Sequence, residues 1–171
     1  MSTKVLMSVE EYLHTSFEPA AEYLDGEVVE RNAGEFFHSA VLGTVLSLLH
    51  PFRKTLGIRI APVIHIRITP TRYRVADIGV WPDESAGMGF PTKPPFLAIE
   101  ILAPEDRMVR MVSKVEEYLS IGVQCIWIID PQERAALYYS RQQPQGTAYT
   151  ILCTENPKIE IPLESAFDLD A

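Results

Sequence analysis

The chain has 171 residues, of which 47% are hydrophobic and 22% charged, and its formal net charge is −8. This composition excludes a disordered or collagen-like chain, and the acidic balance excludes a protein that coats nucleic acid through a uniform positive field. The length predicts a single domain over residues 1–171. Because we find neither a signal peptide nor roughly 20 consecutive apolar residues, we expect a cytoplasmic protein that does not enter a membrane.

The first predicted elements are a short helix and a hairpin. Ser8 followed by Glu11 has the spacing of a capping box, which predicts a helix that ends before Pro19. The pair Asp25-Gly26 supplies a tight turn between two short strands, and the first of these strands carries Glu22.

Apolar residues then recur at helical spacing from residue 35 to about residue 55, which predicts one long helix with a face in the core. Two segments rich in β-branched and aromatic residues follow at 57–69 and 72–81, and a turn separates them. They predict adjacent antiparallel strands. A loop rich in Gly and Pro covers residues 84–95.

The second half alternates strand and helix patterns. FLAIEILA at 96–103 predicts a buried strand, residues 105–122 predict a helix that stops at Gly122, and QCIWIID at 124–130 predicts another buried strand. The remaining short strands are expected to extend the sheet or its edge. The fold class is therefore mixed α/β.

Two carboxylates stand alone in apolar strands. Glu100 is the one ionisable residue within FLAIEILA, and Asp77 is the one between Val75 and Trp81. A buried carboxylate costs several kcal/mol unless it is paired, hydrogen-bonded or bound to a cation. A divalent cation between Asp77 and Glu100 would also offset their mutual repulsion. The alternative is that each carboxylate caps a turn, pairs with an arginine or points out from an edge strand.

The ligand types indicate which metal such a site would hold. Neither Cys125 nor Cys153 has a second ligand nearby at zinc spacing. Sites made of oxygen ligands select Mg²⁺ or Mn²⁺ over zinc.

Lys114 adds a positive charge to this pair. The predicted helix after Glu100 has an apolar face and a basic flank; the face consists of Met108, Val112, Val115 and Leu119, and the flank of Arg107, Arg110 and Lys114. At the boundary between core and solvent, Lys114 could reach back toward the preceding strand. The alternative is a solvated surface lysine paired with Glu116 or Glu117.

The order of several motifs resembles the Uma-type restriction endonuclease family of the PD-(D/E)xK superfamily. These motifs are YLDGE, a His-bearing helix, ADIGVW, FLAIEILAP and KVEEYLSIGVQCIWIIDP, and together they cover nearly the whole chain. The resemblance implies a restriction-endonuclease-like fold with a central mixed sheet flanked by helices. It also implies a metal-dependent phosphodiesterase site in which Asp77 and Glu100 bind metal, Lys114 is the catalytic lysine and Glu22 is the N-terminal acidic residue.

The chain departs from the superfamily pattern at three positions. Ala76 replaces the Pro before the Asp, Leu102 replaces the Lys two residues after the Glu, and Ala103 replaces a Ser. A lysine missing from the strand must be replaced from the helix by Lys114.

These assignments predict a Mg²⁺- or Mn²⁺-dependent DNA endonuclease. Asp77, Glu100 and the carbonyl of Ile101 would hold the ion, and Glu22 would bind it through water or orient the nucleophile. The alternative function is a catalytically inactive module that keeps the nuclease fold and binds nucleic acid or a protein. Cleavage of both duplex strands needs two sites, which predicts a homodimer.

Phosphate contacts are expected from basic residues around the site: Arg67, Arg72, Arg74 and Arg107. The alternative for the three strand arginines is a solvated strand edge. His38 is either a neutral core histidine, which its helical spacing favours, or an accessory residue beside the site, which the family resemblance favours.

Overall fold

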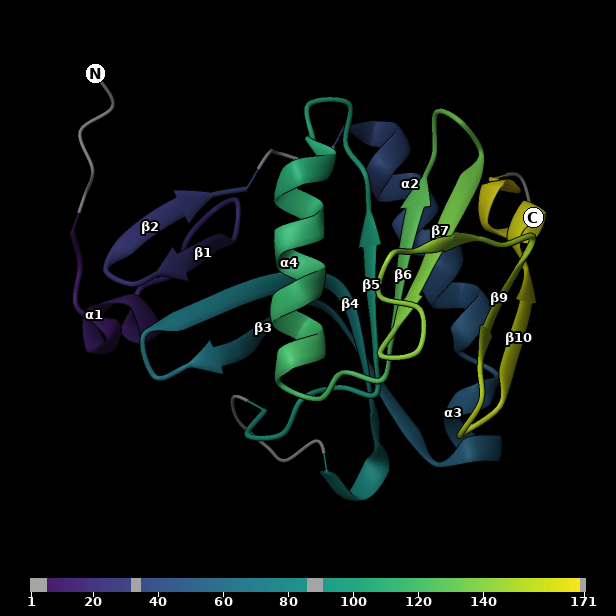
Figure 1. Cartoon of the computed structure of the whole chain (residues 1–171), viewed down its shortest axis with the longest axis horizontal. Coiled ribbons are helices and arrows are strands. Elements are labelled where there is room, and N and C mark those ends of the chain that lie inside the picture. Colours follow the sequence, from purple (N-terminus) through teal and green to yellow (C-terminus); the bar gives the residue numbers. More distant parts are fainter. Residues whose placement is uncertain (1–5, 32–34, 86–90, 170–171) are drawn as a thin grey trace.

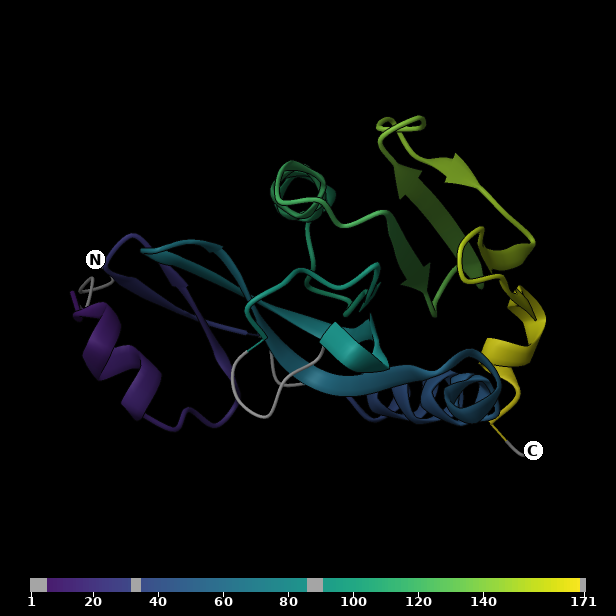
Figure 2. The same ribbon diagram turned by 90° about the horizontal axis from the view of Figure 1, so that it is seen from below.

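In the computed structural model of the chain, residues 6–31, 35–85 and 91–169 are described. The central feature is an eight-stranded mixed sheet with helix α2 on one face and helix α4 on the other (Figures 1 and 2). Its strands follow the order β2-β1-β4-β5-β6-β7-β8, and β3 pairs with β4. This arrangement confirms the predicted fold class of a central mixed sheet flanked by helices.

The N-terminal elements form as predicted. Helix α1 (Val9–His14) begins at Ser8, whose side chain accepts a hydrogen bond from the Glu11 N–H at 3.2 Å. Strands β1 (Ala21–Leu24) and β2 (Glu27–Glu30) pair as a hairpin. The two turn residues between them have positive φ angles of 52° and 102°, as a tight hairpin turn requires.

The predicted helix over residues 35–55 is two helices. Helix α2 (Phe36–Leu49) ends just before Pro51, and helix α3 (Phe52–Leu56) follows and ends at Gly57. The long helix was therefore a wrong prediction. Proline has no N–H to donate, and its ring clashes with the carbonyl four residues earlier, so Pro51 starts a helix rather than continuing one.

Strands β3 (Ile58–Thr69) and β4 (Arg72–Pro82) are the predicted antiparallel pair, and a short 3₁₀ turn, η1 (Asp83–Ser85), follows them. Residues 86–90 of the predicted loop lie outside the described part of the chain.

Strand β5 (Leu97–Ile101), helix α4 (Met108–Ser120) and strand β6 (Cys125–Asp130) form a parallel strand pair with a crossover helix. The helix is rotated relative to the prediction. Its buried residues are Met111, Lys114, Val115 and Tyr118, whereas Met108 and Val112 are exposed. The predicted apolar face is correct for Val115, which is buried, and for Leu119, which packs against the core, but wrong for Met108 and Val112. The prediction also placed Lys114 at the boundary with solvent, whereas that side chain is buried.

The C-terminal strands divide between two sheets. Strands β7 (Ala135–Ser140) and β8 (Thr147–Ala148) extend the main sheet as predicted, while β9 (Ile151–Thr154) and β10 (Ile159–Pro162) form a separate two-stranded sheet. This hairpin and the 3₁₀ helix η2 (Leu163–Phe167) pack into the same core as α2.

Two large apolar cores cover the sheet, and a smaller aromatic cluster packs α1 against β1 and β4. One core packs α2 and the C-terminal hairpin against one face, and the other packs α4 against the opposite face. Among the described helices, none is both long enough and apolar enough to cross a membrane.

Candidate active site

Strand β4 has two partners along one edge, and a fork opens between them. Strand β1 pairs with Arg72 and Tyr73, and β5 pairs with Ile78 to Val80, while β3 runs along the other edge. Residues 74–77 lie between these two pairings. Buried backbone groups need hydrogen-bond partners, so other groups must supply them here.

Glu22 and Lys114 supply the missing backbone partners. The Val75 N–H donates to Glu22 Oε1 at 3.2 Å, and Lys114 Nζ donates to the Val75 carbonyl at 2.6 Å. Lys114 Nζ also lies 3.2 Å from Glu22 Oε1 and donates to Glu100 Oε2 at 2.8 Å. Three residues singled out from the sequence therefore meet in the fork: Glu22 from β1, Glu100 from β5 and Lys114 from α4.

Asp77 and Glu100 lie where strands β4 and β5 separate. The pairing of these strands stops at Ile78–Ile99, and Asp77 and Glu100 are the next residue of each strand beyond it. Glu100 contacts Lys114 of α4, whereas Asp77 contacts His38 of α2. Asp77 and Glu100 are each 1% exposed. The Ile101 N–H donates to Asp77 Oδ2 at 2.7 Å, which ties strand β5 to the carboxylate.

Two further cationic or titratable groups approach Asp77. Arg31 Nη2 donates to Asp77 Oδ1 at 2.5 Å, and His38 Nε2 lies 3.4 Å from Asp77 Oδ2. His38 thus lies beside the site, whereas Arg31 was not foreseen from the sequence. Its one local signal is a basic residue directly after a predicted strand.

Tyr118 is the other residue that sequence reasoning missed. Its hydroxyl donates to Glu100 Oε1 at 2.8 Å, and its side chain is fully buried. The available signal was its spacing, because Tyr118 follows Lys114 by one helical turn on the same face.

The carboxylates of the fork have strongly different pKa values. Burial raises the pKa of Glu100 to about 7, although the Lys114 ammonium acts in the opposite direction. Burial would also raise the pKa of Asp77, but the hydrogen bond with His38 and the charges of Arg31 and Lys114 hold it well below its usual range. Neighbouring titratable groups whose environments separate their pKa values are typical of acid and base sites.

Glu22 and Lys114 both remain charged at neutral pH. Burial acts against the charge of Glu22, but Lys114 and Arg74 lower its pKa to about 2. Burial likewise disfavours the ammonium of Lys114, yet Glu100 and Glu22 raise its pKa above the ordinary value.

A cleft of about 300 Å³ leads to the fork. Glu22, Asp77, Glu100 and Lys114 line it together with Arg107 and other residues from the start of α4. Arg107 therefore lies where a phosphate approaching the carboxylates would pass.

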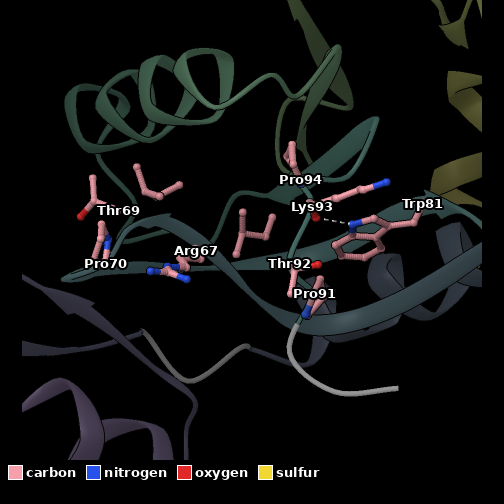
Figure 3. A pocket seen from close by; sticks show the side chains of 10 residues that line it. Arg67, Thr69, Pro70, Trp81, Pro91, Thr92, Lys93 and Pro94 are labelled. Atoms are coloured by element: carbon pink, nitrogen blue, oxygen red, sulfur yellow. Dashed lines mark hydrogen bonds between the residues drawn. The ribbon is translucent and has the colours of Figure 1, made fainter. Parts of the chain in front are cut away.

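Arg67 occupies a different place. It lines a separate pocket of about 260 Å³ with Trp81, Lys93 and neighbouring residues (Figure 3). The structure does not bring Arg67 into the cleft with Asp77.

Arg72 and Arg74 are engaged in ion pairs within the protein. Arg74 contacts Glu22 at 2.7 Å and Glu117 at 2.6 Å, and Arg72 contacts Glu117 at 2.7 Å and Asp25 at 2.5 Å. A phosphate would have to compete with these carboxylates.

The donor set fits a hard divalent cation through two carboxylates. In the part of the chain that is described, no group of three or more His, Cys, Asp or Glu side chains is arranged to hold a metal ion. Mg²⁺ is commonly bound by one or two carboxylates, with water and substrate phosphate completing the shell. Asp77 and Glu100 line the same cleft, and their carboxylate oxygens are the ligand type that such an ion prefers.

Comparisons with known proteins support a nuclease. The family model Uma2, described as a putative restriction endonuclease, matches residues 9–170. A crystal structure titled as a putative nuclease belonging to DUF820, from Anabaena variabilis ATCC 29413, superposes with a TM-score of 0.82 at 21% identity. The match covers 95% of this chain and 98% of that chain. A search of curated proteins gives no match.

Proposed function

The chain belongs to the Uma2 family, described as putative restriction endonucleases, and from this membership we propose that it is a Mg²⁺- or Mn²⁺-dependent DNA endonuclease of the PD-(D/E)xK type. The observation that carries the proposal is the convergence of Glu22, Asp77, Glu100 and Lys114 on one buried fork that opens into a cleft.

Asp77 and Glu100 would hold the ion, with the carbonyl of Ile101 as a further ligand. Bound there, the ion would lower the pKa of a water molecule and offset the charge that develops on the scissile phosphate. Asp77 is ready for this role because its depressed pKa keeps it ionised. Glu100 has a pKa of about 7, so it ionises fully only above neutral pH unless a cation is present.

Lys114 is the proposed source of fixed positive charge at the phosphate. Its ammonium is held by the Val75 carbonyl at 2.6 Å and by Glu100 at 2.8 Å, so it is already oriented before substrate arrives. Glu22 holds the other side of the ammonium at 3.2 Å and acts as a positioning residue; it could also contact the ion through water.

Arg107 is the proposed phosphate contact at the mouth of the cleft. Arg72 and Arg74 would instead stiffen the fork, because they connect β4 to Glu22 and Glu117. A local basic entrance of this kind would let a protein with a net charge of −8 bind DNA.

The direct test is cleavage of supercoiled plasmid with Mg²⁺ by the wild type and by Asp77→Asn. We expect nicking by the wild type, no nicking in EDTA, and a loss of about 10²-fold or more in Asp77→Asn. Asp83→Asn is the matched control because that carboxylate is exposed just beyond the same strand. Equal nicking by wild type and Asp77→Asn, or none by either, would contradict the proposal.

The rival function is a nuclease-fold module that binds nucleic acid or a protein without chemistry. Leu102 and Ala103, which replace the superfamily Lys and Ser, are the observations that favour it. A thermal shift with Mn²⁺ that disappears in Glu100→Gln favours the enzyme, whereas DNA binding that ignores metal, without cleavage, favours the module.

Double-strand cleavage would require two sites, so we also propose a symmetric dimer. Light scattering of the pure protein, alone and with a duplex oligonucleotide, would test this expectation.

A further inference from the structure

Arg31 places a guanidinium where a cation is needed beside Asp77. It directly follows β2, and its Nη2 lies 2.5 Å from Asp77 Oδ1, while its side chain is still 20% exposed at the rim of the cleft. Its charge also interacts with Glu100 and Glu22, which together with Asp77 hold its pKa above the ordinary value against the effect of burial.

Both carboxylate oxygens of Asp77 are engaged in the free protein. Arg31 donates to Oδ1 and the Ile101 N–H donates to Oδ2. A divalent ion bound by Asp77 would lie beside the Arg31 guanidinium, and two like charges so close together in a buried site repel each other. Either a cation must leave when the ion binds, or an anion must arrive with it.

Arg31 is the cation best placed to leave. Lys114 has a 9% exposed side chain and is fixed by the Val75 carbonyl, and Arg74 is fixed from two sides by Glu22 and Glu117. Arg31 instead approaches from the rim, and the long stem of an arginine can turn toward a ligand in the cleft. A planar guanidinium is also suited to grip two oxygens of a phosphate.

We propose that Arg31 is a catalytic residue that neutralises Asp77 in the free protein and transfers to the scissile phosphate when metal and DNA bind. The proposal rests on the proposed nuclease function. Under this proposal metal binding and DNA binding are cooperative. The metal ion takes Asp77 and the DNA phosphate takes Arg31, so each ligand breaks the Arg31–Asp77 ion pair and frees the group that the other ligand needs. By linkage, DNA must raise the affinity for metal by the same factor by which metal raises the affinity for DNA.

The test measures Mn²⁺ affinity by titration of the full chain, with and without a phosphorothioate duplex that resists cleavage. Arg31→Met keeps the stem and removes the charge, and Arg110→Met is the matched control from the same cleft. Without DNA, we expect Arg31→Met to bind Mn²⁺ about tenfold more tightly than the wild type, and Arg110→Met to bind within about twofold of it.

The duplex should then raise the Mn²⁺ affinity of the wild type by about tenfold and that of Arg31→Met by much less. At saturating Mn²⁺, kcat of Arg31→Met should fall by about 10²-fold, because the phosphate contact is lost. Arg31→Lys retains a charge, so its Mn²⁺ affinity should lie between those of the wild type and Arg31→Met. Such an order would show that the side-chain charge competes with Mn²⁺ for Asp77 and that a change in folding does not cause the effect.

Equal Mn²⁺ affinities in wild type and Arg31→Met, with equal gains from DNA, would overturn the role of Arg31 while leaving the metal site intact. If Asp77→Asn binds Mn²⁺ as the wild type does, or if no variant binds it under any condition, the proposed function fails and the role of Arg31 fails with it.

Discussion

The second half of strand β4 has two unlike ends, a charged end at Asp77 in the middle of the strand and an aromatic end at Trp81, with Gly79 between them. Asp77 is surrounded by Arg31, His38 and the Ile101 N–H. Trp81 is 2% exposed, and its indole donates to the Lys93 carbonyl at 2.9 Å (Figure 3). A Cβ added to Gly79 would come within 2.5 Å of the Trp81 ring, so the ring lies directly over the glycine.

The two ends of this segment contribute to the protein in opposite ways. Burial of the large indole, with its N–H satisfied, stabilises the fold through apolar area and close packing. Burial of Asp77 and Glu100 costs free energy, which ion pairs and hydrogen bonds only offset. The comparison implies that stability is concentrated at the Trp81 end and chemistry at the Asp77 end.

The largest expected effect on stability is at the aromatic end. Trp81→Ala should lower the free energy of unfolding by about 3–5 kcal/mol, because it leaves a cavity over Gly79. Denaturant unfolding measures this loss, and the cleavage rate per folded molecule should stay within about twofold of the wild type. A variant that keeps its stability but loses cleavage would break the proposed division between the two ends.

Lys114→Met should have the next largest effect, from the charged end. It removes the cation between Glu100 and Glu22, and breaking a buried ion pair costs about 3 kcal/mol. The loss should be smaller at pH 5, where Glu100 is protonated. Lys158→Met, at an exposed ion pair with Glu160, is the control, and an equal loss there would argue against a special role of burial.

Glu100→Gln tests whether ionisation of the buried Glu100 lowers the stability of the fold. Burial raises the pKa of Glu100 from 4.5 to about 7. The contribution of Glu100 to the free energy of unfolding is therefore fully present below pH 4.5 and is lost as the pH rises through 7. Relative to the wild type, the Gln variant should therefore gain on the order of 1–3 kcal/mol between pH 4.5 and pH 8. Unfolding free energies across this range would reveal it, and a difference that does not change with pH would refute the raised pKa.

The smallest effect is expected at an exposed ion pair outside strand β4. Arg134 and Glu164 form an ion pair with 51% and 74% exposed side chains. Glu164→Gln should change the unfolding free energy by less than about 0.5 kcal/mol and leave cleavage unchanged. A larger change would mean that surface charges, and not only those in the fork, are important for stability.

Much of the fold could be predicted from local patterns, because each pattern has a local cause. The Ser8 cap, the Asp25-Gly26 turn and the apolar run around Glu100 fold as their sequences indicate. The break of the long helix at Pro51 could also have been predicted from the proline alone.

The candidate site could be predicted only in part. The isolation of Asp77 and Glu100 in apolar strands was a visible signal, and the structure does bury both, at the point where β4 and β5 separate. The orientation of α4 was not visible, because helical spacing cannot show that a lysine points inward to a carboxylate on another strand. Contacts of Arg31 and Tyr118 join segments far apart in the sequence, and no local pattern reports them.

The predicted roles of the arginines show the same limit. Arg72 and Arg74 were expected to meet phosphate, but the hairpin and α4 bring Asp25, Glu22 and Glu117 to them. Arg107 lines the cleft as expected of a phosphate contact. Whether an arginine meets a carboxylate of the protein or lines the cleft depends on which strands and helices the fold brings together. Local sequence patterns do not predict these long-range contacts.

The most direct measurement of the central claim is the position of bound metal. Crystals grown with Mn²⁺ and a phosphorothioate duplex should show anomalous density within coordination distance of carboxylate oxygens of both Asp77 and Glu100. Density elsewhere, or none at the fork while Arg31 still contacts Asp77, would contradict the account.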